Sequence, residues 1–413
     1  MNILMLASYF PPEIGSASHL FYELGGELIR NGHQVTALTT FPRSYNVSQS
    51  VQRYRRKLFV REEMDGIRVI RVRSMPTPRD NIFARGMEHF ILPFLLLLGG
   101  AVSGKQDAML IYSPPLPFGI TGYILSKVKR IPFVVNIQDL YPQAVIDLGL
   151  LKNRSLIRVF RAIERFVYLK ANFLTVHSEG NRQYVISRGA RADRVTVIHN
   201  WSDTGEIIPS PKLNEFRLEN GLDGKFVVSY AGIISYSQDL ETIIESAALL
   251  KDRSDVFFVV VGDGSQKEQL LSKASELKLD NVRFLPWQPK EKYAQVLSAS
   301  DVCLVTLKKD KVSTPVVPRK LSDIMASGRP VIAGVPLDGD TPKIVEAAQC
   351  GLSVEPGNAE MLAQAILQLY ENPALAGELG KNGRDYAEKH FSLDVCAREY
   401  EELFEKVCDV KRT

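Results

Sequence analysis

Short apolar runs alternate with helical patterns along the first part of the chain. Residues 3–7 of "NILMLAS" are all apolar, which is typical of a strand buried on both faces of a sheet. A Pro- and Gly-containing loop follows, and apolar residues then recur at helical spacing over residues 16–30 until "NGH" ends the helix. The next run, "QVTALTT" at 34–40, completes a β-α-β unit, and such units predict a parallel, doubly wound sheet.

The alternation continues in two series separated by a polar segment. The first series predicts further strands at "GIRVIRV" (66–72), "AMLIYS" (108–113), "PFVVNIQ" (132–138), "FLTVHS" (173–178) and "RVTVIHN" (194–200). The second predicts strands at "KFVVSYAG" (225–232), "VFFVVVGDG" (256–264), "VRFLPW" (282–287), "VCLVTL" (302–307), "RPVIAG" (329–334) and "CGLSVEP" (350–356). Residues 201–221 between them are polar and contain prolines, as linkers do.

The pattern therefore predicts an α/β protein with two Rossmann-like, doubly wound domains that face each other across a cleft. We place the first domain at residues 1–204, a linker at 205–220 and the second domain at 221–385. Residues 386–413 are expected to form a helix that packs back on the first domain. Ligands bind beyond the carboxyl ends of the strands in such sheets, so the loops that follow the strands are the candidate sites.

Composition and charge narrow the function. A chain of 413 residues is too long for one hydrophobic core, which agrees with two domains. The net charge of +4 is too small to indicate a nucleic acid partner. The four cysteines have no CxxC spacing and no histidine at metal-ligand spacing, which argues against zinc and favours reduced thiols in the cytoplasm. No signal peptide is recognisable at the start of the sequence.

One apolar segment is a candidate for contact with a membrane. "FILPFLLLLGGAV" (90–102) is shorter than the roughly 20 residues that span a bilayer. It is either a buried core helix or a helix lying in the membrane interface, and its polar flanks slightly favour the second. Cationic residues cluster before it, at 51–61 and 68–85, where a solvated surface is the simpler interpretation. We expect a cytoplasmic protein that can dock on the inner face of the cell membrane through residues 51–102.

Two glycine loops follow the first strand of each series. They are "PPEIGSAS", which contains Gly15, and "AGIISYSQDLE", which contains Gly232. A glycine there lets backbone N–H groups and the start of the next helix approach an anion closely. Neither loop spells G-x-G-x-x-G and the sequence has no P-loop motif, so nicotinamide binding is poorly supported and no cofactor is expected.

The segment "TPVVPRKLSDIMASGRP" (314–330) predicts a short helix with cations at its positively charged end. Arg319 and Lys320 lie in its first turn, where the helix dipole disfavours them. Lys320 and Asp323 lie off the apolar face, about 4.5 Å apart along the axis. They suit a nucleoside diphosphate, with phosphate at the cation and ribose hydroxyls at the acid; alternatively they form an exposed ion pair. The position after a predicted strand favours the ligand.

Asp139 is the best placed carboxylate of the first domain. It directly follows the strand "PFVVNIQ", at a position comparable to that of the helix just described. An aspartate before Tyr-Pro can also be only a turn residue. The sequence shows neither a Ser-His-Asp order nor an HExxH motif.

Seven segments spread over nearly the whole chain carry a resemblance to a known family. They are "SYFPPEIGSASHLFYELGGELIRNGHQVTALTT", "NIQDLYPQAVIDLGLL", "VTVIHNWSD", "YAGIISYSQDLETIIESA", "VVVGDGSQKEQL", "VRFLPWQPKEKY" and "PRKLSDIMASGRPVIAG". The sequence resembles the retaining GT-B glycosyltransferases of family 4, most closely the bacterial fucosamine-transferase-like enzymes of surface polysaccharide assembly. These segments are specific for the fold and the reaction class, and none identifies the sugar.

The resemblance implies roles for individual residues. Gly15 and Gly232 would bring backbone N–H groups near the donor diphosphate, and Trp287 would lie where the family's main chain meets the base. Asp323 takes the place of the second acid of the family's E-x7-E motif, which binds the ribose hydroxyls. Asp139 would orient the sugar or the acceptor.

The sequence also departs from the family. Pro315 stands where the first Glu of the motif would fall, and "GIISYSQ" lacks the Arg and Lys that many members carry after the glycine. Gln138 replaces a His that many members place before the Asp of the first-domain loop. Lys320, together with Arg319, is therefore expected to supply the positive charge at the diphosphate.

The resemblance implies a retaining, metal-independent glycosyltransferase. It would move a hexosyl or N-acetylhexosaminyl group from a UDP-sugar to a hydroxyl of a lipid-linked glycan in capsule, O-antigen or exopolysaccharide assembly. Asp139 and Lys320 are the candidate catalytic residues, because Lys320 can stabilise the charge that grows on the leaving diphosphate. Two alternatives stay open: a nucleotide-sugar 2-epimerase of the same fold, and a membrane-associated, non-catalytic scaffold with a degenerate donor site.

Overall fold

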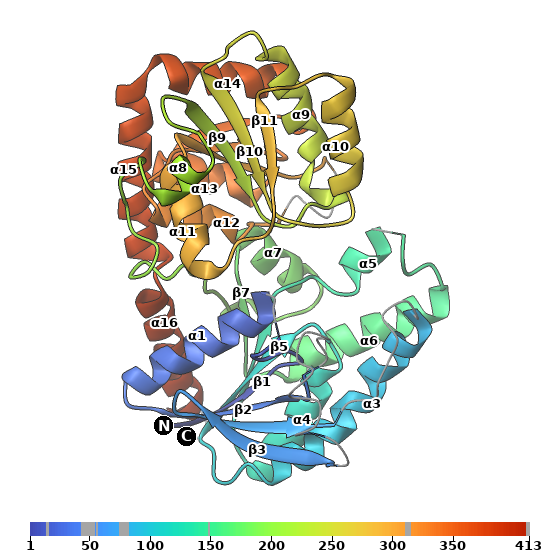
Figure 1. Cartoon of the computed structure of the whole chain (residues 1–413). Helices are drawn as coiled ribbons and strands as arrows, with labels where there is room; N and C mark the ends of the chain where they lie inside the picture. The colour runs from blue at the N-terminus through green and yellow to red at the C-terminus, as the bar shows by residue number, and fades with distance from the viewer. Residues whose placement is uncertain are drawn as a thin grey trace. The chain divides into compact units, whose positions relative to one another are not determined.

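The structure is a computed structural model that describes residues 1–13, 16–42, 54, 57–73, 82–147, 149–309 and 315–409, with only the backbone at 16 and 82–90. The chain divides into two compact units (Figure 1). The first unit comprises Met1–His199 and Cys396–Thr413, and the second comprises Asn200–Val395. Residues 205–220, where a linker is predicted, belong to the second unit and include the short helix α8 (Glu215–Glu219).

The first unit is built on a sheet that has eight strands in the described part of the chain. Their order is β3-β4-β2-β1-β5-β6-β7-β8, and all neighbours are parallel except β3 and β4. The strands are β1 (Asn2–Leu6), β2 (Gln34–Thr40), β3 (Phe59–Met64), β4 (Ile67–Val72), β5 (Ala108–Ser113), β6 (Phe133–Ile137), β7 (Phe173–Val176) and β8 (Val195–Val197). The helices are α1 (Ser16–Arg30), α3 (Ile82–Ala101), α4 (Phe118–Lys129), α5 (Gln143–Asp147), α6 (Arg154–Lys170), α7 (Glu179–Ser187), the 3₁₀ helix η1 (Ala192–Arg194) and α16 (Leu393–Asp409).

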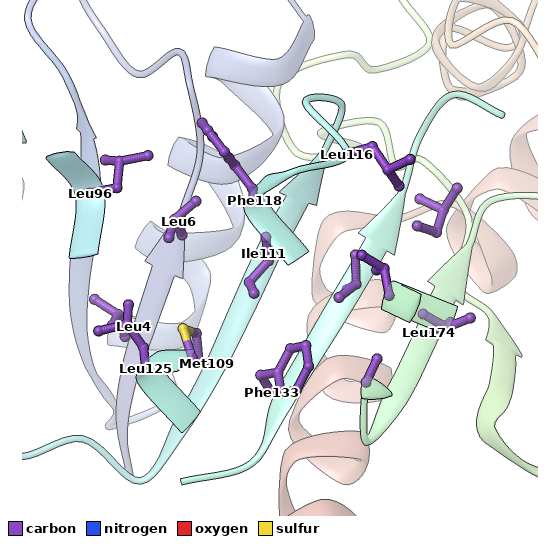
Figure 2. Close-up of a cluster of buried hydrophobic side chains, with 14 of the residues drawn as sticks. Leu4, Leu6, Leu96, Met109, Ile111, Leu116, Phe118, Leu125, Phe133 and Leu174 are labelled. Atoms are coloured by element: carbon purple, nitrogen blue, oxygen red, sulfur yellow. The ribbon is translucent and has the colours of Figure 1, made fainter. Parts of the chain in front are cut away.

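Alternating side chains of these strands pack on helices at opposite faces of the sheet. Leu4 and Leu6 of β1 belong to the cluster that includes Leu96 of α3 and Leu125 of α4 (Figure 2). Because side chains alternate along a strand, the polar Asn136 of β6 points to the other face. There its Nδ2 donates a hydrogen bond of 2.9 Å to the hydroxyl of Tyr400 on α16. Helices α3, α4 and α6 thus cover one face, and the C-terminal helix α16 packs on the other.

The second unit is built on a sheet that has six strands in the described residues, all parallel, in the order β11-β10-β9-β12-β13-β14. The strands are β9 (Phe226–Ala231), β10 (Val256–Val261), β11 (Val282–Leu285), β12 (Val302–Thr306), β13 (Val331–Gly334) and β14 (Gly351–Val354). The helices besides α8 are η2 (Tyr236–Gln238, 3₁₀), α9 (Leu240–Leu249), α10 (Lys267–Glu276), α11 (Lys290–Ala299), α12 (Lys320–Ala326), α13 (Asp340–Ala348), α14 (Ala359–Glu371) and α15 (Pro373–His390). Two clusters of buried apolar side chains, one with α9 and α14 and one with α12 and α13, lie against these strands.

The predicted fold class is confirmed. Every strand that the apolar runs predict is present, and both units are doubly wound α/β structures. The edge strand β3 was not predicted. Its sequence "FVREEM" is half polar, and only Val60 is buried, so it lacks the continuous apolar run of a central strand.

The apolar segment 90–102 lies in α3 and just beyond it, and the helix has two apolar sides. Leu92 and Leu96 are buried in the core, whereas Phe94 and Leu98 are exposed over 67% and 69% of their area. The segment therefore packs into the core on one side and presents apolar side chains to solvent on the other. None of the described helices combines the length and the hydropathy that a bilayer-spanning segment needs. Most of the cationic segments at 51–61 and 68–85 lies outside the described residues or has only its backbone described.

Candidate active site

The strand order of the second unit brings two loops together. Strand β9 lies between β10 and β12, so the chain reverses its direction of winding between β9 and β12. In doubly wound sheets the crevice at such a reversal, beyond the carboxyl ends of the strands, is the usual ligand site. Here the loop after β9 carries Gly232, and the segment after β12 leads to Lys320.

The loop after β9 is tied to the loop after β10 through the main chain. The N–H of Gly232 donates to the carbonyl of Val261 at 2.9 Å, and the N–H of Ile234 donates to the carbonyl of Asp263 at 2.9 Å. A side chain on Gly262 would collide with the carbonyl of Gly232. The prediction that Gly232 presents N–H groups to the diphosphate therefore cannot include its own N–H in this arrangement. Gly232 instead leaves space for the side chain of Lys320.

Lys320 reaches the glycine loop from the start of α12. Its Nζ lies 2.9 Å from Oε1 of Gln238 and 3.8 Å from the centre of the Tyr230 ring. A Cβ built on Gly232 would lie 3.0 Å from this Nζ, and Gly232 has φ +152°, where a side chain is strained. Gly232 therefore leaves the space that the ammonium group occupies. Gly232 and Lys320, predicted from separate motifs, meet in the structure.

The ammonium group has no ionic partner among the described residues. Gln238 is neutral, and within the described part of the chain no carboxylate forms an ion pair with Lys320. The surrounding protein atoms remove water from the amine without replacing it by negative charge, and this desolvation lowers the pKa of Lys320 to about 7. The alternative of an exposed ion pair between Lys320 and Asp323 is thus not what the structure shows.

Gln238 is held in place by its neighbours. The Tyr230 hydroxyl lies 3.2 Å from Oε1 of Gln238 and donates at 2.8 Å to the carbonyl of Ile233, while Oγ1 of Thr306 donates at 2.5 Å to the carbonyl of Gln238. Burial raises the pKa of Tyr230, so the phenol stays neutral. Tyr230 and Gln238 were missed at the sequence level, because a neutral amide and a strand tyrosine carry no motif.

Asp323 lies one turn further along α12 and is buried. Its Oδ2 is 3.3 Å from the hydroxyl of Tyr293, which belongs to α11. Burial, and then the charge of Asp323, raise the pKa of Tyr293, so this hydroxyl donates to the carboxylate. Tyr293 thus orients the carboxylate of Asp323, and the sequence did not indicate this contact.

The remaining predicted donor residues lie around this centre or outside the described chain. Arg319 is the residue before α12 and is half-buried. Trp287 lies on the loop between β11 and α11 with 59% of its area exposed, so its indole is accessible. Gly15 lies outside the described residues.

Asp139 belongs to the first unit, at the carboxyl end of β6. Its side chain is exposed on one side, yet the protein atoms around it reduce its solvation and raise its pKa. The buried Tyr112, at the end of the neighbouring strand β5, has its pKa raised by burial and further by Asp139. Gln138 turns inward, and its Nε2 donates to Oδ1 of Asn136 at 2.9 Å. Asp139 is thus the group at this strand end that remains open to solvent.

Comparisons with known proteins identify the families that the chain resembles. The family described as glycosyl transferases group 1 matches residues 214–386, and the family described as a glycosyl transferase 4-like domain matches residues 15–201. A glycosyl transferase of Escherichia coli (strain K12) assigned to colanic acid biosynthesis, WcaI, is 25% identical over an alignment of 410 residues that covers 97% of this chain and 98% of the relative.

Two solved structures are similar over the full length. Sucrose-phosphate synthase from Thermosynechococcus elongatus has a TM-score of 0.77 at 20% identity and covers 99% of both chains. HepE of Anabaena, solved in complex with UDP-glucose, has a TM-score of 0.71 at 19% identity and covers 98% of this chain and 100% of its own. The family matches favour glycosyl transfer over the epimerase and scaffold alternatives. The chain belongs to the GT-B glycosyltransferases, with a glycosyl transferase 4-like domain followed by a group 1 domain.

Proposed function

We propose that the protein is a retaining, metal-independent glycosyltransferase that moves a hexosyl or N-acetylhexosaminyl group from a UDP-sugar to a hydroxyl of a lipid-linked glycan. The similarity to HepE, solved with UDP-glucose, supports a uridine diphosphate donor. The relative assigned to colanic acid biosynthesis supports a polysaccharide product. Membership of the fucosamine-transferase-like subgroup is part of the proposal and rests on the sequence resemblance alone. The proposed place of action is the inner face of the cell membrane, where such acceptors are glycosylated.

Lys320 is the observation that carries the proposal. A desolvated ammonium group with a pKa of about 7 and no ionic partner among the described residues is stabilised by an anion that binds beside it. The Gly232 loop leaves room for the amine at the carboxyl end of β9. A diphosphate is an anion of suitable charge for this position.

The chemistry follows from where charge develops. The C1–O bond to the diphosphate breaks, the sugar gains oxocarbenium character, and negative charge grows on the leaving diphosphate. Lys320, with Arg319 beside it, stabilises that charge more strongly in the transition state than in the bound donor, and no metal ion is required for this step. The acceptor hydroxyl forms the new bond to C1 and passes its proton to the leaving phosphate.

The other candidates hold the donor and the acceptor. Asp323, oriented by Tyr293, accepts hydrogen bonds from the ribose hydroxyls, and the accessible Trp287 lies near the base. Asp139 of the first unit orients the sugar or the acceptor. No cofactor takes part in this scheme.

The test is a calorimetric screen of UDP- and GDP-sugars, followed by product analysis with the sugar that binds. We expect one UDP-sugar to bind, slow hydrolysis without acceptor, and an anomeric configuration in the product that matches the donor by NMR. Lys320→Ala should lower turnover by roughly tenfold or more, because charge stabilisation in the transition state is lost.

Three outcomes would contradict the proposal. Binding of no nucleotide sugar would support the scaffold, an epimerised donor formed without acceptor would support the epimerase, and full activity of Lys320→Ala would remove the assigned phosphate cation.

A further inference from the structure

Three helices form one continuous layer over a face of the first sheet. Helices α3 and α4 approach each other closely at Gly100 of α3. A Cβ on Gly100 would lie 2.5 Å from Leu125 of α4. On the other side of α4, a side chain on Gly119 would collide with Val167 of α6. Helix α4 therefore lies between α3 and α6, and we call the outer surface of these helices the α3–α4–α6 face.

One edge of this face is apolar. Phe94, Leu98 and Val102 follow each other at intervals of four residues along α3 and its end, and all three are exposed. They continue on α4 with Ile124 and with Val128, which is exposed over 68% of its area. These exposed apolar side chains add nothing to the packing of the core. Large apolar patches on the surfaces of soluble proteins mark interaction sites.

The other edge is cationic. Arg154, Arg158 and Arg165 lie within about 40° of one another around α6, on the side away from its buried residues. All three are exposed, and within the described residues none of them forms an ion pair. Lys127 and Arg130 add two exposed cations at the end of α4, between the two edges.

The described side chains of these three helices include no exposed acid. Helix α4 contains none, and α6 contains only Glu164, which is buried and accepts a 2.9 Å hydrogen bond from Arg161. The described side chains of α3, residues 91–101, include none either. An apolar edge beside unpaired cations is the arrangement by which protein surfaces bind anionic lipid.

We propose that the α3–α4–α6 face docks on an anionic phospholipid bilayer, with the apolar edge in the acyl boundary and the arginines of α6 at the headgroup phosphates. A second copy of the chain fits this face poorly, because a twofold axis sets the cationic edge either against itself or against the apolar edge, and α4 and α6 carry no exposed acid to pair the cations. The sequence indicated only residues 51–102 as a membrane contact, whereas α4 and α6 lie beyond that segment. The inference does not depend on the identity of the donor.

The experiment is sedimentation of the full chain with vesicles of phosphatidylcholine alone or mixed equally with phosphatidylglycerol. We expect binding to the mixed vesicles, little binding to phosphatidylcholine, and weaker binding as NaCl rises from about 0.1 to about 0.5 M. Reversing Arg154, Arg158 and Arg165 to Glu should lower the partition coefficient by at least about 100-fold, at roughly fivefold per cation. Phe94→Ser/Leu98→Ser should lower it by roughly tenfold.

Matched controls lie on the second unit. Lys251→Glu/Lys381→Glu/Lys389→Glu changes the net charge equally at exposed positions, and Leu218→Ser/Leu249→Ser changes exposed leucines of α8 and α9. Both should bind vesicles like the parent chain, and circular dichroism verifies that every variant is folded. Absence of binding to the mixed vesicles, equal binding to phosphatidylcholine, or equal loss in the controls would overturn the inference. Vesicle binding without nucleotide-sugar binding would leave the docking surface intact and contradict only the proposed function.

Discussion

The lowered pKa of Lys320 predicts that donor affinity depends on pH above neutrality. The perturbation is the removal of one proton from the amine that lies beside Gly232. A bound diphosphate favours the charged amine, so its pKa rises on binding and the complex takes up a proton. Affinity is therefore greatest below pH 7 and falls as pH rises above 7.

The magnitude follows from the pKa. With a pKa of about 7, about 90% of the amine is charged at pH 6 and about 3% at pH 8.5. If only the charged amine supports binding, the Kd rises by about 30-fold over this range. Tyr230 does not interfere, because burial raises the pKa of its phenol and keeps it neutral.

The assay is isothermal calorimetry with UDP-glucose, or the UDP-sugar that the screen identifies, because its diphosphate is a diester and does not titrate between pH 6 and 8.5. Measurements in buffers of different ionisation enthalpy should show close to one proton taken up per donor at pH 8. Two variants separate charge from shape: Lys320→Met should bind weakly at every pH, and Lys320→Arg should show no pH dependence. A change in Kd below about threefold, or the same pH dependence in Lys320→Met, would refute the reasoning.

Two further predictions concern buried hydrogen bonds. Asp323→Ala should raise the Kd for the donor by roughly tenfold, and a donor that lacks the ribose hydroxyls should lose no further affinity in this variant, whereas additive losses would place the ribose elsewhere. Tyr400→Phe should lower the free energy of unfolding by about 1–3 kcal/mol in urea titrations, because Asn136 and Thr175 lose a buried partner, while Tyr236→Phe at an exposed position should have no effect.

The central strands were predictable and the edge strand was not, for the same physical reason. A strand such as β10, "VFFVVV", is buried on both faces, and burial on both faces demands a continuous apolar run. Among the described strands β3 pairs only with β4, and its outward Glu63 faces water. Glu62 lies on the inner side, where it forms an ion pair with the buried Arg71, so both acids are compatible with an edge strand. The sequence then offers no pattern that distinguishes β3 from a charged loop.

The candidate site residues that the sequence could indicate are those whose charge opposes the helix dipole. Lys320 and Arg319 oppose the dipole at the start of α12, which suggested either an anion or an exposed ion pair, and the position after a predicted strand favoured the anion. Gln238 breaks no rule, and its contact with Lys320 spans 82 residues. This contact forms because β9 and β12 are neighbours in the sheet, and no local sequence pattern predicts that pairing.

The neutrality of Gln238 has a chemical consequence for the proposed reaction. A carboxylate at this position would keep Lys320 charged in the empty site, but a diphosphate would then have to compete with it for the same ammonium group. The amide oxygen 2.9 Å from Nζ orients the amine without neutralising it. The loop has no cation of its own, so Lys320, with Arg319 beside it, must serve the diphosphate. Holding that lysine by a neutral group leaves its charge available when negative charge grows on the leaving group.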